Sequence, residues 1–447
     1  MNFVLHNCRI VNEGEVREGD LRVRSGRIDK IGGSLSASAG ETDIDAGGRL
    51  LFPGLIDDQV HFREPGLTHK ADIATESRAA AAGGITSFME MPNVRPPTLD
   101  MDKIREKCAI AADTARVNYA FYLGASTDNL SAIATADARQ IAGVKIFMGA
   151  STGGMLVDDE AVLEKIFNAA PTLIAVHCES TPRINRNMED MAKQTDIPAS
   201  AHPQIRDVRA CYESSSLAAA LAKKTGARLH ILHISTAREL ELFTDGEATQ
   251  KSLTCEACAH HLLFDDSDYA RLGMRLKTNP AVKTRADRDA LRRAVASGRI
   301  DILATDHAPH LPAEKDLPYV EAAAGMPLAE YALPAFLELA ADGDLTYPQI
   351  AARGAHVPAD IFNVVARGYI REGYWADMVL VEDKPAPVRD TVLSKCGWTP
   401  FAGRTFQHRI VTTFVNGECV WQDGKINDAV RGMPLEFDRP SRRARPI

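Results

Sequence analysis

The chain is most informative at Pro53-Gly54-Leu55-Ile56-Asp57-Asp58-Gln59-Val60-His61-Phe62-Arg63-Glu64-Pro65-Gly66. Its apolar residues predict a short buried strand with a Pro-Gly pair at each end. Side chains alternate along a strand, so we expect Asp57, Gln59 and His61 to share one face. Polar groups on a buried face need partners. A metal ion would supply them, and so would a hydrogen-bonded polar cluster at the strand end.

The composition is that of an ordinary soluble protein, and 447 residues predict one large domain with a smaller one. A net charge of −8 argues against a nucleic-acid surface. No apolar run approaches the ~18 residues of a membrane helix, and residues 1–30 are too charged for a signal peptide. Eight scattered cysteines favour reduced thiols in the cytoplasm over disulfides. The basic run Arg439–Arg445 is expected to be a loose tail.

A short cluster of soft ligands, Cys255-x-x-Cys258 followed by His260-His261, imitates a zinc knuckle. The distance along the chain from the cysteines to the histidines is too short for a zinc finger. We therefore interpret these residues as structural, with a structural zinc as the less favoured alternative.

Both ends of the chain carry short alternating stretches separated by turn residues, which predict β-strands. These strands are Phe3–Leu5, Arg9–Val11, Leu21–Val23 and Arg27–Ile31, then Asp377–Val381, Ile410–Val415 and Cys419–Trp421. We expect residues 1–52 and 366–447 to form one small antiparallel β-sandwich domain, with residues 53–365 as a separate domain between them.

The middle of the chain alternates between apolar β-rich runs and Ala/Leu-rich helical stretches. The predicted strands are Leu55–His61, Ile85–Met91, Val117–Leu123, Gly143–Met148, Leu173–His177, Arg228–His233, Ser252–Cys255 and Ile300–Asp306. The predicted helices are Asp72–Ala82, Met101–Thr114, Asp159–Ala169, Arg206–Thr225 and Arg285–Ser297. Eight strands alternating with helices predict an α/β fold of the (β/α)8 TIM-barrel type, with an open doubly wound sheet as the alternative.

Side chains of the types that bind metals recur at the carboxyl ends of these strands. They are Gln59 with His61, Lys145, His177, His233 and Asp306. In a barrel these strand ends meet on one face, where active sites lie. The joint pattern is far more specific than a single strand-end histidine, which is usually structural, and it predicts a metal centre.

The chain resembles the amidohydrolase superfamily and, within it, the dihydroorotases. The resemblance rests on Asp57-x-Gln59-x-His61-x-Arg63-Glu64-Pro65-Gly66, Met91-Pro92-Asn93, Val144-Lys145-Ile146-Phe147, His177-x-Glu179, His233-x-Ser235-Thr236, Asn279-Pro280 and Asp306-His307-Ala308-Pro309-His310. It implies zinc-dependent, reversible hydrolysis of the cyclic amide of dihydroorotate to N-carbamoyl-aspartate, a step of pyrimidine biosynthesis. It also implies a homo-oligomer, with a dimer as the expected form.

The resemblance implies a role for each matching residue. His61, His177 and His233 would bind metal, and Asp306 would both bind metal and shuttle a proton. Lys145 would carry a carbamate that bridges two metals, and its apolar surroundings fit, because a buried unmodified ammonium is costly.

The resemblance also implies a site for the free carboxylate of the substrate. Arg63, Asn93 and His310 would hold that carboxylate, and Asn279 would contact the amide edge of the ring. Arg63 suits the task because its planar guanidinium matches a carboxylate with two hydrogen bonds. Leu311–Tyr319, directly after His310, is a candidate lid.

The chain departs from the family pattern at two places. Gln59 stands where a histidine is usual, and an amide is a poorer zinc ligand than imidazole, so we expect two metals with one held weakly, or a single metal. Asn279-Pro280-Ala281-Val282-Lys283 also differs from the usual motif. Two alternatives follow: another cyclic amidohydrolase, such as an allantoinase or hydantoinase, or a catalytically impaired partner of aspartate transcarbamoylase.

Overall fold

The structure is a computed structural model, which describes residues 1–149, 155–192, 196–389 and 391–440. The strands at its centre are β6 (Leu55–Val60), β7 (Ile85–Glu90), β8 (Asn118–Phe121), β9 (Leu123–Gly124), β10 (Val144–Phe147), β11 (Ile174–His177), β12 (Leu229–Ile231), β13 (Leu253–Cys258) and β14 (Ile302–Ala304). All of their pairings are parallel, in the orders β6-β7-β8 and β9-β10-β11-β12-β13-β14.

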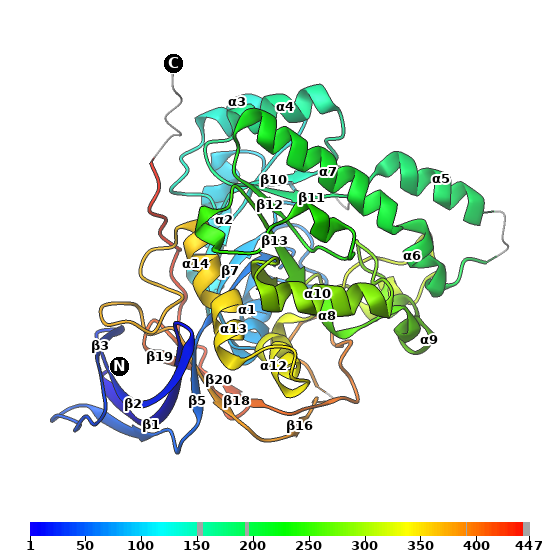
Figure 1. Ribbon diagram of the computed structural model, residues 1–447. Helices are drawn as coiled ribbons and strands as arrows, with labels where there is room; N and C mark the ends of the chain where they lie inside the picture. The colour runs from blue at the N-terminus through cyan, green and yellow to red at the C-terminus, as the bar shows by residue number, and fades with distance from the viewer. Residues whose placement is uncertain (150–154, 193–195, 390, 441–447) are drawn as a thin grey trace.

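Two connections close these strands into a barrel. The first is β8 and β9, which lie on either side of Tyr122 and serve as one interrupted strand. The second is a parallel bridge between Val60 and His307, reinforced by the His61 amide, which donates to the His307 carbonyl at 2.8 Å. Helices surround the barrel (Figure 1). The predicted fold class is confirmed.

The five predicted helices are present as α1 (Ile73–Ala82), α2 (Met101–Thr114), α4 (Glu160–Ala169), α7 (Val208–Thr225) and α10 (Arg285–Ser297). Each begins after a side chain that accepts a hydrogen bond from a backbone amide of the first turn, which satisfies one of the free amides there. These N-cap residues are Asp72, Asp100, Asp159, Asp207 and Thr284. The other helices are α3 (Leu130–Thr135), α5 (Thr181–Met191), α6 (His202–Ile205), α8 (Ala259–Leu263), α9 (Tyr269–Leu272), α11 (Pro312–Lys315), α12 (Ala332–Ala341), α13 (Tyr347–Ala351) and α14 (Val357–Phe362).

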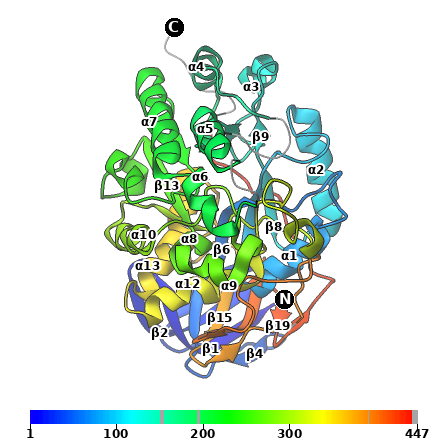
Figure 2. The same cartoon turned by 90° about the vertical axis from the view of Figure 1, so that its right-hand side faces the viewer.

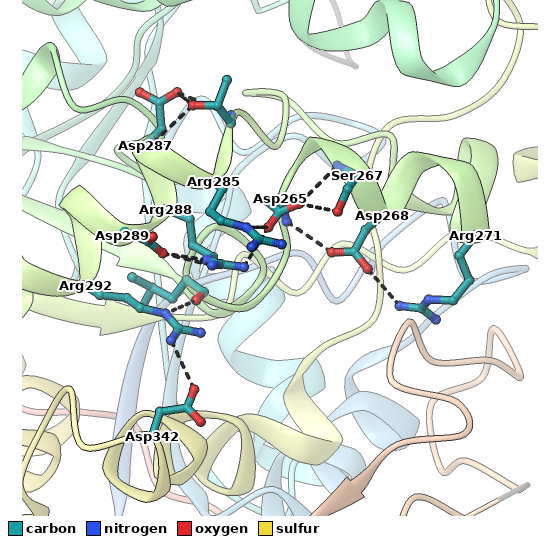
Figure 3. A network of polar contacts seen from close by, with 12 residues as sticks. Asp265, Ser267, Asp268, Arg271, Arg285, Asp287, Arg288, Asp289, Arg292 and Asp342 are labelled. Carbon is teal, nitrogen blue, oxygen red and sulfur yellow. Dashed lines mark hydrogen bonds and ion pairs between the residues drawn. The ribbon is translucent and has the colours of Figure 1, made fainter.

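Helix α10 is held to its neighbours by a network of ion pairs (Figure 3). Asp265 is buried and accepts from Arg288 at 2.8 Å and from Arg285 at 3.3 Å. Arg292, one turn further along, donates to Asp344 at 2.7 Å and Asp342 at 3.1 Å, which follow α12. The network therefore joins α10 to the segments before α9 and after α12.

Both ends of the chain contribute to one nine-stranded sheet beside the barrel (Figures 1 and 2). Its strands are β1 (Phe3–Asn12), β2 (Glu15–Arg24), β3 (Arg27–Gly32), β4 (Thr42–Asp45), β5 (Leu50–Pro53), β15 (Met378–Glu382), β18 (Arg409–Val415), β19 (Glu418–Gln422) and β20 (Lys425–Ile426). The two halves meet where β5 pairs with β15. The exact domain boundaries at residues 52/53 and 365/366 stay predictions.

Two details of this sheet differ from the sequence-based expectation. The sheet is not purely antiparallel, since β4 and β5 both pair with β1 in parallel. Phe3–Leu5 and Arg9–Val11 also belong to one strand, β1, whose register shifts between Leu5 and Cys8, where Asn7 has a φ of +55°. The bulge interrupts the alternation of side chains, so one strand reads as two in the sequence.

The basic run Arg439–Arg445 was expected to be a loose tail, and for Arg439 this was wrong. Leu435 and Phe437 are buried, and the backbone of residues 433–435 bonds to Tyr119. The Arg439 guanidinium donates to the carbonyls of Ala138, Ile141, Ala142 and Phe362. The segment therefore runs from the sheet back along the barrel, red in Figure 1. Residues 441–447 lie outside the described residues.

In the described part of the chain, no helix has both the length and the apolar character needed to cross a membrane.

Candidate active site

One cavity, of about 60 Å³, collects almost all the residues that the sequence singled out. It is lined by Gln59, His61, Arg63, Asn93, Lys145, Phe147, His177, His233, Thr278, Asn279, Asp306, Ala308, Ala324 and Gly325. Of the predicted site residues only His310 is not in this lining. The structure therefore brings residues from distant strand ends together around one cavity.

His177 and His233 form the most compact part of the site. His177 Nδ1 lies 3.0 Å from His233 Nε2, and both rings are buried. Burial lowers the pKa of each imidazole, most strongly that of His233. Both rings are therefore neutral near pH 7 and offer lone pairs to a ligand.

Lys145 lies at the same side of the cavity on β10. Its ammonium is buried, has no hydrogen-bond partner among the described residues, and lies 4.5 Å from the centre of the Phe147 ring. Burial lowers the pKa of Lys145 to about 7, well below its usual value. The amine is therefore largely unprotonated just above neutral pH, a form that can react with CO2.

These residues fit a metal centre. Two ring nitrogens 3.0 Å apart are close to the separation of two ligands on one zinc, about 3.3 Å for Zn–N bonds of 2.0–2.1 Å. Lys145 Nζ is a buried polar atom without a hydrogen-bond partner in the described structure. Native proteins rarely leave such an atom unless another group satisfies it. His177 Nε2 lies 3.3 Å from Glu179 Oε2, so the ring can keep the lone pair of its Nδ1 for a metal.

His61 and Asp306 form a second pair in the lining of the cavity. His61 Nε2 lies 3.1 Å from Asp306 Oδ1, and His61 Nδ1 lies 2.9 Å from Asn93 Oδ1. An amide oxygen only accepts, so Nδ1 carries the proton and Nε2 keeps its lone pair for the cavity. Gln59 donates its amide N–H to Asp306 Oδ1 at 3.2 Å, so in this arrangement it serves Asp306 as a hydrogen-bond donor.

Three site residues have left-handed backbone conformations, with φ of +68° at Arg63, +40° at His233 and +49° at Asp306. Such conformations cost energy in non-glycine residues and cluster at functional sites. Glu256 accepts from the His233 amide at 3.0 Å, and Asp57 accepts from both the amide and the hydroxyl of Thr305. Asp57 thus joins β6 to β14 and does not line the cavity.

Arg63 is the cation of the site. It is only 3% exposed, and no carboxylate in the described ranges lies within 4.0 Å of its guanidinium. Its Nε donates to the Pro309 carbonyl at 3.3 Å, and its Nη2 lies 3.1 Å from His310 Nε2. A buried guanidinium without a carboxylate, at the wall of a cavity, is poised to bind an anion.

The candidate lid, Leu311–Tyr319, does not line the cavity, whereas Ala324 and Gly325, which follow it in the sequence, do. Lys315, at the end of α11, is fully buried and donates to the carbonyls of Lys277, Ala323 and Gly325 at 2.7–2.9 Å. These bonds hold residues 323–325 against the cavity. Asn279 also lines the cavity, and its side-chain oxygen has no hydrogen-bond partner among the described residues.

Two further clusters lie outside the cavity lining. Cys258, His260 and His261 approach one another within 4.8 Å, whereas Cys255 is not part of this group, so the four residues of the knuckle-like motif do not share one centre. Asp58, His230 and Glu256 form the second cluster, with His230 Nε2 3.3 Å from each carboxylate. The two carboxylates raise the pKa of His230 to about 9 against the opposing effect of burial, so a shared proton accounts for this cluster.

Sequence reasoning missed Glu256 and Lys70. Glu256 was not considered because the predicted strand ended at Cys255, whereas β13 continues to Cys258. Extending the strand would have placed Glu256 on the same face as Cys258. Lys70 carries no signal in the sequence, since only the fold brings it to His310, at 3.2 Å.

Comparison with known proteins places this geometry in a family. The amidohydrolase family model matches residues 50–420. The chain is 36% identical to a dihydroorotase of Halobacterium salinarum, covering 95% of this chain and 97% of that protein. It is 31% identical to an allantoinase of Bacillus velezensis, covering 100% and 99%. An L-hydantoinase (dihydropyrimidinase) from Arthrobacter aurescens superposes with a TM-score of 0.91 at 27% identity, covering 98% and 100%. The chain belongs to the amidohydrolase family, among its cyclic amide hydrolases.

Proposed function

We propose that this enzyme hydrolyses dihydroorotate reversibly to N-carbamoyl-aspartate, in pyrimidine biosynthesis. The observation that carries the proposal is Arg63, a buried guanidinium without a carboxylate partner among the described residues, in the same cavity as His177 and His233. Dihydroorotate carries a ring carboxylate, which such a group would bind with two hydrogen bonds. Hydantoin, dihydrouracil and allantoin carry none. The dihydroorotase of H. salinarum at 36% identity supports the same choice.

One or two zinc ions complete this proposal. Lys145, His177 and His233 would hold one ion and His61 with Asp306 the other, with Lys145 between them as a carbamate. Gln59 would be a weak ligand or none, because its amide donates to Asp306. Bound zinc supplies a water of pKa near 7 and polarises the amide carbonyl.

The residues of the chain then position the substrate and move the proton. Arg63 and Asn93 bind the carboxylate of the substrate, and the side-chain oxygen of Asn279 accepts from the ring amide. Asp306 takes a proton from the attacking water and gives it to the ring nitrogen as the carbon–nitrogen bond breaks. In ring closure Asp306 must begin protonated, so closure is favoured at lower pH and hydrolysis at higher pH.

Two other functions remain in the same framework. An allantoinase or hydantoinase would use the same metal ligands but would have no use for the free Arg63 guanidinium. A catalytically impaired partner of aspartate transcarbamoylase would be expected to lose metal ligands, whereas here His61, Lys145, His177, His233 and Asp306 all line one cavity.

A substrate panel tests the proposal. Zinc-loaded enzyme would be assayed with dihydroorotate, dihydrouracil, hydantoin and allantoin, and with carbamoyl-aspartate in the reverse direction. We expect turnover of dihydroorotate and carbamoyl-aspartate at least 100-fold above that of the neutral rings. Preference for a neutral ring would assign the enzyme to the allantoinases or hydantoinases instead. If the zinc-loaded enzyme turned over none of these substrates, the catalytically impaired partner would be favoured.

A further inference from the structure

The environment of His310 is electrostatically unusual. This imidazole is buried, and each of its ring nitrogens faces a cation, with Nδ1 3.2 Å from Lys70 Nζ and Nε2 3.1 Å from Arg63 Nη2. Ammonium and guanidinium groups only donate hydrogen bonds, whereas neutral imidazole has one acceptor and one donor nitrogen. Whichever nitrogen carries the proton, one N–H of His310 therefore points at another donor.

Protonation does not remove this conflict. Burial and the neighbouring Arg63 lower the pKa of His310 to about 3, so the ring is neutral at physiological pH. Glu314 does not remove it either, because its Oε2 lies 3.7 Å from Nδ1, beyond hydrogen-bond distance. The tautomer of His310 is therefore set by whichever of the two cations is held more firmly.

Lys70 is the more firmly held of the two. Its ammonium donates to Glu314 Oε1 at 2.8 Å, and Glu314 Oε2 in turn accepts from the Leu311 amide at 2.8 Å. The backbone at His310 is held as well, because the His310 carbonyl accepts from Trp398 Nε1 at 2.7 Å. A fixed donor at Nδ1 makes Nδ1 the acceptor and places the proton on Nε2.

This tautomer changes what Arg63 can bind. With a proton on Nε2, His310 offers no lone pair to Arg63 Nη2, and the only protein acceptor of the guanidinium in the described structure is the Pro309 carbonyl at 3.3 Å. Arg63 lines the cavity, so its remaining N–H groups are left for a ligand there. With the proton on Nδ1 instead, Nε2 would accept from Arg63 and compete with an incoming anion.

We propose that Lys70 and Glu314 are positioning residues that fix the Nε2–H tautomer of His310 and so keep Arg63 free for a carboxylate. The proposal deepens the substrate assignment and rests on it in one respect, namely that the ligand of Arg63 is the carboxylate of a cyclic amide. The Lys70–Glu314 pair is thereby a determinant of specificity for acidic over neutral rings, although neither residue lines the cavity.

The experiment compares Lys70→Met with Lys70→Arg, which keeps the cation, and with Arg95→Met. Arg95 is an exposed cation near Lys70 that makes no hydrogen bond to His310 in the described structure, so its removal controls for the loss of a charge. Each variant is measured for its KM and kcat on dihydroorotate and dihydrouracil, for zinc content, and for the His310 tautomer by nitrogen-15 NMR, with the His310 signal identified by its absence in His310→Gln. Glu314→Gln serves as a second route to the same change.

We expect the Nε2–H tautomer in the wild-type enzyme and in Arg95→Met, and the Nδ1–H tautomer in Lys70→Met. Lys70→Met should raise KM for dihydroorotate about tenfold, with kcat, zinc content and the kinetics of dihydrouracil nearly unchanged, and Lys70→Arg should restore most of the loss. An Nδ1–H tautomer in the wild type, or unchanged tautomer and KM in both Lys70→Met and Glu314→Gln, would overturn the inference. Failure of the wild type to prefer the acidic ring would instead overturn the proposed function, and the tautomer would still decide the role of Lys70.

Discussion

At the scale of single residues, the site combines neutral imidazoles that can bind a metal with a guanidinium cation that can bind an anion. His177 and His233 are kept neutral by burial, whereas Arg63 stays charged because even its lowered pKa is about 10. The sequence predicts the type and order of these residues because they stand at or near the ends of predicted strands. It does not predict the contacts of Lys70 and Glu314 around His310, because only the fold brings these residues together.

Asp306 is the proposed proton carrier. Replacing it with Asn removes the basic oxygen but keeps the size of the side chain, and general acid–base catalysis typically contributes about 10²–10⁴-fold. We therefore expect Asp306→Asn to lose at least about a hundredfold in kcat for hydrolysis and for ring closure alike. Steady-state assays in excess zinc measure both directions, and normal turnover in either would refute the role.

Lys145 predicts a dependence of metal uptake on pH and CO2. A lysine pKa of about 7 in the metal-free protein leaves about nine-tenths of the amine neutral at pH 8 but only about a tenth at pH 6. Only the neutral amine forms a carbamate. Metal-free enzyme should therefore take up zinc faster and to a higher level at pH 8 with bicarbonate than at pH 6 or without CO2.

The control for this prediction is Lys145→Ala, which should show no response to bicarbonate. Intact-mass measurement of the zinc-loaded enzyme should find the added mass of one CO2, absent from the variant. Equal zinc uptake with and without CO2 would contradict the carbamate.

At the scale of elements, the sequence predicts which strands and helices exist better than where they end. Leu229–Ile231 is all that remains of the predicted strand Arg228–His233, because His233 turns into a left-handed conformation at its end. Asp306 similarly lies beyond Ile302–Ala304. His61, His233 and Asp306 occupy the irregular backbone just after regular strands, and the periodicity of side chains carries no information about that irregularity.

Asp265 offers a test of how α10 is held (Figure 3). It is buried and accepts from Ser267, Arg285 and Arg288. Asp265→Ala removes the buried acceptor of these three donors, which should lower the free energy of unfolding by about 1–3 kcal/mol. Denaturant titration measures the shift in midpoint. The exposed neighbour variant Asp266→Ala should change little, and equal midpoints for both variants would contradict the role of the network.

At the scale of the whole molecule, the two ends of the chain lie together in one sheet. The sheet uses both ends of the sequence, and the segment after it returns to the barrel. The alternation of strands in both terminal regions predicted a shared β-rich domain, and the fold comparison confirms one. The return of residues 433–439 was not predictable, because the backbone groups that this segment contacts lie far away in the sequence and come near it only in the fold.

Arg439 tests how much the returning segment, residues 433–439, stabilises the barrel. Arg439→Met removes the donors of four backbone carbonyls near the barrel, so we expect unfolding to become easier by about 1–3 kcal/mol. Exposed Arg431 provides the matched control, since Arg431→Met leaves those carbonyls satisfied. Thermal unfolding of the two variants compares them, and identical curves would show that the returning segment does not stabilise the barrel.

The central claim is that a buried arginine beside a metal centre selects an acidic ring. Its most direct test is a double comparison of kcat/KM, in which wild type and Arg63→Ala are each assayed with dihydroorotate and with dihydrouracil, at equal zinc content. We predict that Arg63→Ala lowers the preference for the acidic ring at least about 30-fold, a coupling of about 2 kcal/mol between guanidinium and carboxylate. A preference that is the same in both enzymes would contradict the claim.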